Sequence, residues 1–271
     1  MEDLTQPMMY YEVDGIMKAK KYYGQNFLKN EEIIKNITDL VNPGENDLII
    51  EIGPGRGALT KYLTQKACDL VCIEIDIDLK DYLDKYQSKK CKIIYEDILK
   101  VDFKEITKNY QNIYVVGNLP YYITSPIIEH LINNIKSKKM VFMVQKEVAD
   151  RYSAKVNTKE YGYFTLFLNF YYEVNNEIFV GKNNFDPIPK VDSEVISLYL
   201  KEEVPNINVE KYFSFLKECF SHKRKTLKNN IISYDYEKIM NVLNKYGLTD
   251  SVRAEQISED IFIEIFKSLE C

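Results

Sequence analysis

The sequence lacks the features that would mark a membrane, secreted or metal-binding protein. Its five cysteines are scattered without paired metal-ligand spacing, which predicts reduced thiols in a cytosolic protein. No continuous apolar run is long enough to span a membrane. The N-terminal residues 1–14 are acidic and polar and lack a signal-peptide pattern. We therefore expect a cytoplasmic protein with neither a metal site nor a membrane partner.

The chain also lacks an excess of positive charge. Its net charge is −5, which taken alone argues weakly against a nucleic-acid partner. The average hides two basic clusters, which are Lys18, Lys20 and Lys21 near the N-terminus and Lys223, Arg224, Lys225 and Lys228 near the C-terminus. Such patches can guide a phosphate backbone even on an acidic protein. Because lysine is abundant throughout the chain, ordinary solvated surface is the alternative interpretation.

Apolar runs that alternate with helical stretches indicate a parallel sheet. We predict five strands in order, over residues 47–52, 70–73, 92–95, 113–116 and 139–144. Asn30 is a candidate N-cap for a helix that precedes them. Beyond them, residues 163–175 and 176–180 are predicted as strand material, and residues 193–200 as a last strand.

The length and the composition predict two domains. The chain has 271 residues, of which 45% are hydrophobic, enough for one large α/β domain and a small second one. After Pro205 the apolar spacing becomes helical, as in Tyr212, Phe213 and Leu216. We therefore predict an N-terminal arm over residues 1–22, an α/β domain over residues 23–203 and a helical C-terminal domain over residues 204–271.

The stretch over residues 115–122 is the first candidate for chemistry. A β-branched run ends at Asn118, which is followed by Leu119, Pro120 and Tyr121. Open α/β folds keep their ligands where parallel strands end. Asn118 can accept and donate hydrogen bonds, Pro120 stiffens the turn, and Tyr121 offers a flat face for stacking. This set suits a planar amine, although a strand-end turn with partly buried tyrosines is the simpler alternative.

The glycine-rich loop over residues 53–58 is the second candidate. It fits both the dinucleotide pattern and the shorter loop of S-adenosylmethionine enzymes, because both need glycines such as Gly53 and Gly55 for close approach of the backbone. Glu74 ends the next strand and can accept from ribose hydroxyls, or it is a surface carboxylate. Asp97 ends the third strand and can accept from an adenine amine, or it is a helix N-cap. Three successive strand ends thus favour an adenosyl site.

Five ordered motifs carry a resemblance to a known family. They are Gly24-Gln25-Asn26-Phe27-Leu28, Glu51-Ile52-Gly53-Pro54-Gly55, Asn118-Leu119-Pro120-Tyr121, Phe185-Asp186-Pro187-Ile188-Pro189-Lys190-Val191-Asp192-Ser193 and Arg224-Lys225-Thr226-Leu227. Together they resemble the rRNA adenine N6,N6-dimethyltransferases, specifically the bacterial KsgA/RsmA family. The resemblance covers residues 21 to about 230, and more weakly the C-terminal residues.

The resemblance implies a fold and a reaction. The fold would be α/β, a Rossmann-like methyltransferase domain with a mainly parallel seven-stranded sheet, followed by a small all-helical domain. The donor would be S-adenosylmethionine, released as S-adenosylhomocysteine. The reaction would dimethylate two adjacent adenosines in the 3′-terminal hairpin loop of 16S rRNA, with the small ribosomal subunit as partner and the enzyme a monomer.

The resemblance also implies roles for individual residues. The cofactor contacts would be Asn26, Leu28, Gly53, Gly55, Glu74, Asp97 and Asn118. The catalytic motif would run from Asn118 through Leu119 and Pro120 to Tyr121. Phe185 would stack on the target base opposite Tyr121. A basic helix with Lys223, Arg224, Lys225 and Lys228 would contact rRNA, although Lys223 stands where the family commonly has a second arginine.

Three rival interpretations remain at this point. An Erm-type enzyme would methylate large-subunit rRNA with the same chemistry. A binding protein would act as a ribosome-assembly checkpoint, with catalysis secondary. A nicotinamide enzyme would use the glycine loop but would leave residues 118–121 without a task.

Overall fold

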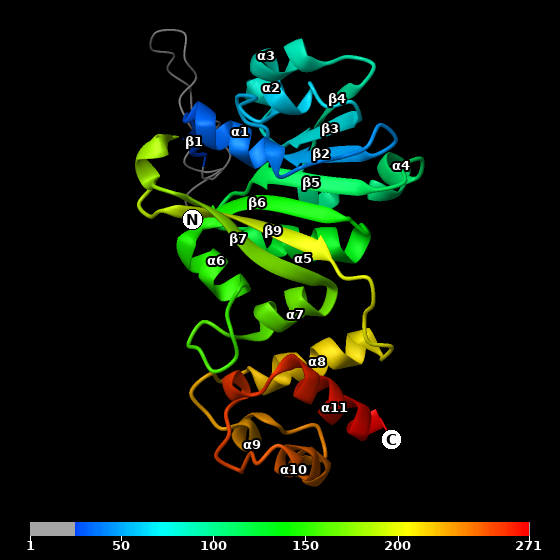
Figure 1. The fold of residues 1–271 in the computed structure, drawn as a ribbon, viewed down its shortest axis with the longest axis vertical. Helices are drawn as coiled ribbons and strands as arrows, with labels where there is room; N and C mark the ends of the chain where they lie inside the picture. Colours follow the sequence, from blue (N-terminus) through cyan, green and yellow to red (C-terminus); the bar gives the residue numbers. More distant parts are fainter. Residues whose placement is uncertain (1–24, 271) are drawn as a thin grey trace, which may run out of the picture.

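The computed structural model describes residues 25–270, so the predicted arm over residues 1–22 lies outside the described residues. The largest sheet has seven strands, in the order β4-β3-β2-β5-β6-β9-β7 (Figure 1). Their bounds are β2 (Leu48–Ile52), β3 (Asp69–Glu74), β4 (Cys91–Tyr95), β5 (Ile113–Asn118), β6 (Lys139–Gln145), β7 (Tyr172–Val180) and β9 (Ser193–Leu200). Strands β2 to β6 pair in parallel, whereas β9 pairs antiparallel with both β6 and β7. The predicted mainly parallel seven-stranded sheet is confirmed.

Helices lie on both faces of the sheet and at one end of the molecule. They are α1 (Glu31–Asp39), α2 (Thr60–Leu63), α3 (Lys80–Leu83), α4 (Phe103–Thr107), α5 (Thr124–Asn134), α6 (Lys146–Tyr152), α7 (Tyr163–Tyr171), α8 (Val209–Cys219), α9 (Leu227–Asn230), α10 (Tyr236–Lys245) and α11 (Glu259–Glu270). In Figure 1, α8 to α11 gather at the end of the molecule opposite α3. None of the helices within residues 25–270 is long and apolar enough to cross a membrane.

The apolar strands form continuous runs because both faces of the sheet are buried. Along β5, Val115 packs in one hydrophobic cluster, whereas its neighbours Tyr114 and Val116 pack in the other, on the opposite face. The first cluster continues from Phe170 of α7 to Tyr212 of α8, and the ring centroids of these two residues lie 5.5 Å apart. The C-terminal helices therefore share one core with the sheet.

The prediction of strand structure from residue 163 is wrong at its start. Tyr163–Tyr171 is helix α7, and the strand β7 begins only at Tyr172. Aromatic and apolar residues fill this helix on nearly every side because it is buried between the sheet and α8. Without a polar face, its sequence shows no helical period, and its aromatic content resembles that of a strand.

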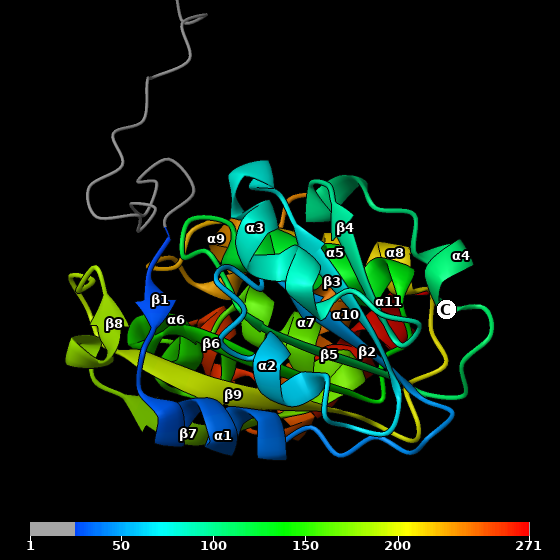
Figure 2. The same ribbon diagram turned by 90° about the horizontal axis from the view of Figure 1, so that it is seen from above.

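A second, two-stranded sheet joins segments that are far apart in the sequence. Strand β1 (Phe27–Leu28) pairs antiparallel with β8 (Phe185–Asp186), and Figure 2 shows the two at one side of the molecule. Helix α1 follows β1, and Asn30 caps it as predicted by accepting from the amides of Glu32 and Ile33.

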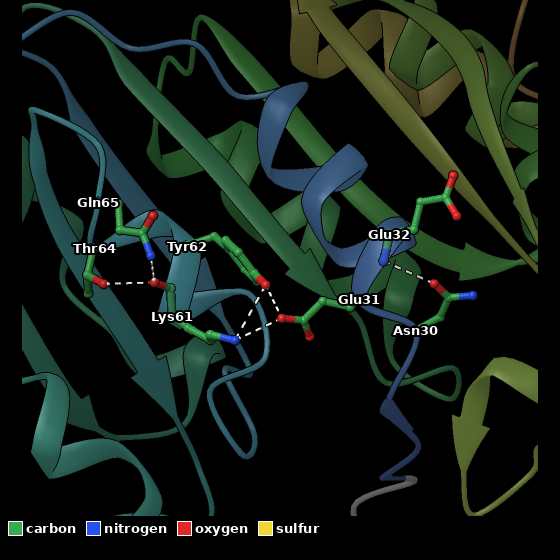
Figure 3. A network of polar contacts seen from close by, with 7 residues as sticks. All are labelled: Asn30, Glu31, Glu32, Lys61, Tyr62, Thr64 and Gln65. Carbon is green, nitrogen blue, oxygen red and sulfur yellow. Dashed lines mark hydrogen bonds and ion pairs between the residues drawn. The ribbon is translucent and has the colours of Figure 1, made fainter.

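The start of α1 is also tied to α2. The Nζ of Lys61 lies 2.8 Å from a carboxylate oxygen of Glu31, and the hydroxyl of Tyr62 donates to the same oxygen (Figure 3). Because α2 follows the glycine loop directly, these contacts fix β1 and α1 beside that loop.

Candidate active site

A cavity of about 410 Å³ lies where β2, β3, β4 and β5 end, at the carboxyl edge of the parallel sheet. Most of the predicted site residues line it, namely Asn26, Leu28, Gly53, Gly55, Glu74, Asp97, Asn118, Leu119, Pro120 and Tyr121. They come from five segments of the sequence. The structure therefore brings together the glycine loop, the strand-end carboxylates and the residues 118–121 in one place.

The glycine loop has a backbone that requires glycine. Gly53 and Gly55 have φ angles of 62° and 60°, in the left-handed region that disfavours side chains. A Cβ on Gly55 would also lie 3.1 Å from the ring of Phe27. The loop is thus closely covered by β1 on one side and keeps its backbone exposed to the cavity on the other.

Glu74 holds this loop in place. Its Oε2 accepts from the Gly55 amide at 3.0 Å and its Oε1 accepts from the Asp76 amide at 2.9 Å. Burial raises the pKa of the Glu74 carboxyl, although both amide donors act in the opposite direction. The side chain is buried, so it is not the surface carboxylate that the sequence left as an alternative. Each oxygen keeps a further lone pair with which to accept from a ligand hydroxyl.

Asp97 lies at the cavity wall and is also a cap. Its Oδ1 accepts from the Leu99 amide at 3.0 Å and so caps the short 3₁₀ helix Ile98–Lys100. The second oxygen, Oδ2, lies 3.9 Å from the Lys100 Nζ. The N-cap alternative is therefore correct for one oxygen, and it is compatible with a ligand contact by the other.

Asn118 ends β5 with its side chain at the cavity and its amide fixed. The Asn118 Nδ2 donates to the main-chain carbonyl of Asn26 at 2.9 Å. Because a carbonyl can only accept, this contact assigns the nitrogen to the Asn26 side and leaves Oδ1 as the acceptor for a ligand. No pattern in the sequence predicts this contact, since the two residues are 92 positions apart.

Hydrogen bonds hold Pro120 and Tyr121 in place in the turn that follows Asn118. The Pro120 carbonyl accepts from the Thr124 hydroxyl at 3.0 Å and from the Ile123 amide at 3.2 Å. The Tyr121 hydroxyl lies 2.7 Å from the Oγ of Ser193, a buried residue at the start of β9. Burial raises the pKa of the Tyr121 hydroxyl, so this phenol stays protonated at neutral pH. The hydrogen bond holds the ring of Tyr121 at the cavity wall.

Glu51 is a cavity residue that the sequence analysis did not single out. It is the one charged residue in the strand β2, and its side chain is buried. The Thr60 hydroxyl donates to its Oε2 at 2.7 Å, and the Cys72 thiol donates to the same oxygen at 3.4 Å. Burial raises the pKa of Glu51 to about 7. A carboxylate within an otherwise apolar strand was the available signal.

Phe185 is placed differently from the other predicted site residues. Its side chain is fully buried in the hydrophobic cluster that contains Leu28 and Val195, and it does not line the cavity, whereas the adjacent Asp186 does. Its predicted stacking on a base stays a prediction, and it would require the ring to leave this packing.

The basic residues near the C-terminus lie apart from the cavity. Lys223, Arg224 and Lys225 do not form the predicted helix, whereas Lys228 lies in the short helix α9. Residues 221–226 form turns between α8 and α9, because the buried Asn230 side chain donates to the carbonyls of Cys219 and His222 and so holds the chain in a bend. Lys223 Nζ donates to the carbonyl of Lys159, and Lys228 Nζ lies 3.0 Å from Asp250.

The lining of the cavity fits S-adenosylmethionine, the group expected from the sequence. Gly53 and Gly55 carry no side chain where the glycine loop lines the cavity, and Glu74 and Asp97 present carboxylate oxygens to hydroxyl and amine donors. Ile75 and Ile98 add apolar surface for a purine ring. The polar and apolar groups of the lining therefore match an adenosyl group.

Comparisons with known proteins show which proteins this chain resembles. A family model described as ribosomal RNA adenine dimethylase matches residues 16–270. A curated protein named ribosomal RNA small subunit methyltransferase A from Malacoplasma penetrans is 42% identical over 248 residues, which cover 91% of this chain and 90% of that protein. The protein of the same name from Fusobacterium nucleatum is 42% identical over 265 residues, with coverage of 93% and 98%.

Two solved structures share the fold. A dimethyladenosine transferase from Plasmodium falciparum superposes with a TM-score of 0.77 at 26% identity, covering 90% of this chain and 97% of that chain. The 23S rRNA methyltransferase ErmE superposes with a TM-score of 0.70 at 22% identity, covering 91% and 100%. The second likeness concerns the fold alone.

Proposed function

Because this chain belongs to the ribosomal RNA adenine dimethylase family, we propose that it dimethylates N6 of two adjacent adenosines in the 3′-terminal hairpin loop of 16S rRNA, with S-adenosylmethionine as methyl donor. Its partner is then the small ribosomal subunit. Relatives about 40% identical that are named small subunit methyltransferase A favour this target over the large-subunit target of an Erm-type enzyme. A nicotinamide enzyme would leave Asn118 and its neighbours without a task.

The observation that carries the proposal is the fixed amide of Asn118 at the cavity. The lone pair of an adenine N6 is delocalised into the ring, so this amine is a poor nucleophile. An acceptor aimed at its N–H groups favours a more tetrahedral nitrogen with a localised lone pair. The Asn118 Oδ1 supplies that acceptor, because the Asn26 carbonyl occupies the other end of the amide. The Leu119 main-chain carbonyl is the second candidate acceptor.

The residues at the other strand ends would hold the donor. Glu74 accepts from the ribose hydroxyls and Asp97 accepts from the adenine amine, while the backbone at Gly53 and Gly55 allows close approach. When bound, S-adenosylmethionine supplies a methyl group on a sulfonium sulfur that is its own leaving group. The chain therefore needs no strong general base, and its main contribution is to align the acceptor amine.

The target base must leave its stack to reach this cavity, and a loop nucleotide does so at lower cost than a paired one. Tyr121 offers the stacking face, and its hydroxyl is held by Ser193. Such stacking contributes roughly 1–3 kcal/mol per base. Phe185 would add a second face on leaving its buried position. Arg224 and Lys225 lie in residues 221–226, the basic turn, and would contact rRNA phosphates.

The experiment that tests the proposal separates the two ribosomal subunits. Small and large subunits that lack the dimethylation are incubated with the protein and methyl-labelled S-adenosylmethionine. We expect label in small-subunit rRNA and background label in the large subunit, with loss of the signal in Asn118→Ala. Label in the large subunit alone would support the Erm-type alternative instead.

A further inference from the structure

The segment of residues 26–31 bridges the glycine loop and the β8 region. On one side Phe27 and Leu28 pair with Asp186 and Phe185, and the Lys29 amide donates to the Asn184 carbonyl at 2.9 Å. On the other side its α1 end contacts α2, which follows the glycine loop (Figure 3). Its Asn26 carbonyl is the group that fixes the Asn118 amide. This segment therefore supplies the acceptor to which the Asn118 side-chain amide is bonded.

Arg56 of the glycine loop contacts this bridge at its centre. The guanidinium carbon lies 4.2 Å from the centroid of the Phe27 ring, and the Nη1 lies 3.7 Å from the Asp186 Oδ2. A Cβ added at the preceding residue, Gly55, would lie 3.1 Å from the same ring, so only glycine leaves room for the ring there. Arg56 thus contacts both Phe27 of β1 and Asp186 of β8.

The contacts of Arg56 with Phe27 and with Asp186 differ in strength. Asp186 has 67% of its side chain exposed, so at 3.7 Å its ion pair with Arg56 is screened and contributes little. The planar guanidinium over the Phe27 ring is the stronger contact, because only 23% of the Arg56 side chain is exposed. The stack on Phe27 is therefore the contact to test.

We propose that Arg56 is a positioning residue, which holds Phe27 against the glycine loop and thereby keeps the Asn26 carbonyl in hydrogen-bonding position for the Asn118 amide. Phe27 is joined to Asn26 by one peptide bond, so a shift of its ring moves that carbonyl. A hydrogen bond of 2.9 Å weakens steeply when its geometry changes. The inference rests on the proposed function only in that Asn118 orients the target amine.

The first test measures the bridge itself, without donor or rRNA. Amide hydrogen exchange is followed by mass spectrometry in the full chain and in the variants Arg56→Met and Phe27→Leu. We expect the peptide over residues 26–30 to exchange on the order of tenfold faster in each variant, because the stack that holds it is lost. The matched control is Lys245→Gln, which removes an exposed ion pair with Glu264 far from the cavity and should leave that peptide unchanged.

The second test asks whether the two residues act as one unit. Single-turnover methyl transfer at saturating donor is compared for Arg56→Met, Phe27→Leu and the double variant, together with donor affinity by calorimetry. We expect each single variant to lower the rate about tenfold and the double variant to be no slower than the slower single one. Donor affinity should fall by a smaller factor than the rate.

Two results would overturn the inference. One is unchanged exchange over residues 26–30 in Arg56→Met, and the other is a double variant whose rate loss equals the product of the single losses. If Arg56 only contacted the donor, affinity would fall and exchange would stay unchanged. Failure of the proposed function is distinguishable, because the wild-type protein would then transfer no methyl group to the small subunit, whereas the exchange test would still report on Arg56.

Discussion

Asn118→Asp separates the presence of an acceptor at this position from its orientation. Aspartate has the same shape and keeps an oxygen for the target amine, but it replaces the Nδ2 donor by a second oxygen. That oxygen would lie 2.9 Å from the Asn26 carbonyl, where two acceptors repel each other. The side chain must therefore rotate, and the aligned acceptor is lost although an acceptor is still present.

The size of the effect follows from the contact that is broken. Loss of one partly buried hydrogen bond to the main chain costs about 1–3 kcal/mol of stability, and each kcal/mol lowers the Tm by about 2–4 °C in a protein of this size. Loss of an aligned polar group that acts in the transition state lowers the rate about 10²–10³-fold. We expect both effects at pH 8, measured by thermal unfolding and by single-turnover transfer to undermethylated small subunits.

The pH dependence gives this prediction its sharpest form. The Asn26 carbonyl favours the protonated form of the introduced carboxyl, because only a protonated carboxyl can donate to it, so its pKa lies above the usual value. As the pH falls through that raised pKa, the O–H restores the hydrogen bond. The rate of Asn118→Asp relative to that of the wild type should therefore rise as the pH falls from about 8 to about 5.5. A variant with wild-type rate and Tm at pH 8 would refute the orienting role of Asn26.

Three further predictions concern separate parts of the site. Ser193→Ala should slow transfer several-fold without weakening donor binding, because it frees the Tyr121 ring; an equal loss of donor affinity would contradict this. The pKa of Glu51 is raised to about 7 in the folded protein, so its contribution to stability is complete below about pH 4.5 and is lost as the pH rises through 7. As the pH rises from 5 to 8, the free energy of unfolding of Glu51→Gln should therefore increase by up to about 3 kcal/mol relative to that of the wild type, and a difference that is independent of pH would exclude the raised pKa of Glu51. Arg224→Gln should reduce the salt dependence of binding to the small subunit by about one unit of slope, whereas Lys228→Gln, which loses a lysine already paired with an aspartate, should reduce it less; equal slopes for both variants would contradict the role of the basic turn.

The sequence was sufficient for the parallel strands and for most of the cavity. Apolar runs such as residues 48–52 are recognisable because both faces of the sheet are buried, and the polar residues that follow them, such as Asn118, meet where parallel strands end. The parallel direction of strands β2 to β6 thus follows from local patterns, whereas their order in the sheet comes from the structure. The clustering of the glycine loop, Glu74, Asp97 and Asn118 needed no tertiary information beyond that.

The parts that could not be predicted depend on tertiary contacts. Helix α7 is covered by α8 and has no polar face, so its sequence shows no helical period. The contact of Asn118 with Asn26 joins residues 92 positions apart, and no pattern in either segment predicts it. Phe185 was predicted from its motif to stack on the target base, which stays a prediction; that its ring is buried in the core beside the pairing of β8 with β1 was not predictable from the motif.

The basic turn shows how a composition pattern can be right about charge and wrong about shape. Arg224 and Lys225 are exposed, as a surface that binds phosphate requires. Their backbone is bent rather than helical because the buried Asn230 side chain binds carbonyls on the far side of the turn. A single buried amide, which the basic pattern does not include, thus decides the local conformation.

The proposed role of Asn118 is that its aligned oxygen directs methyl transfer to N6 of adjacent adenosines in small-subunit rRNA. The most direct measurement is mass spectrometry of nuclease fragments of 16S rRNA, taken from undermethylated small subunits after incubation with S-adenosylmethionine and either the wild type or Asn118→Ala. We expect two adjacent N6,N6-dimethyladenosines in the 3′-terminal hairpin loop with the wild type and none with the variant. Equal dimethylation by Asn118→Ala, or modification of any other nucleotide in place of these two, would contradict it.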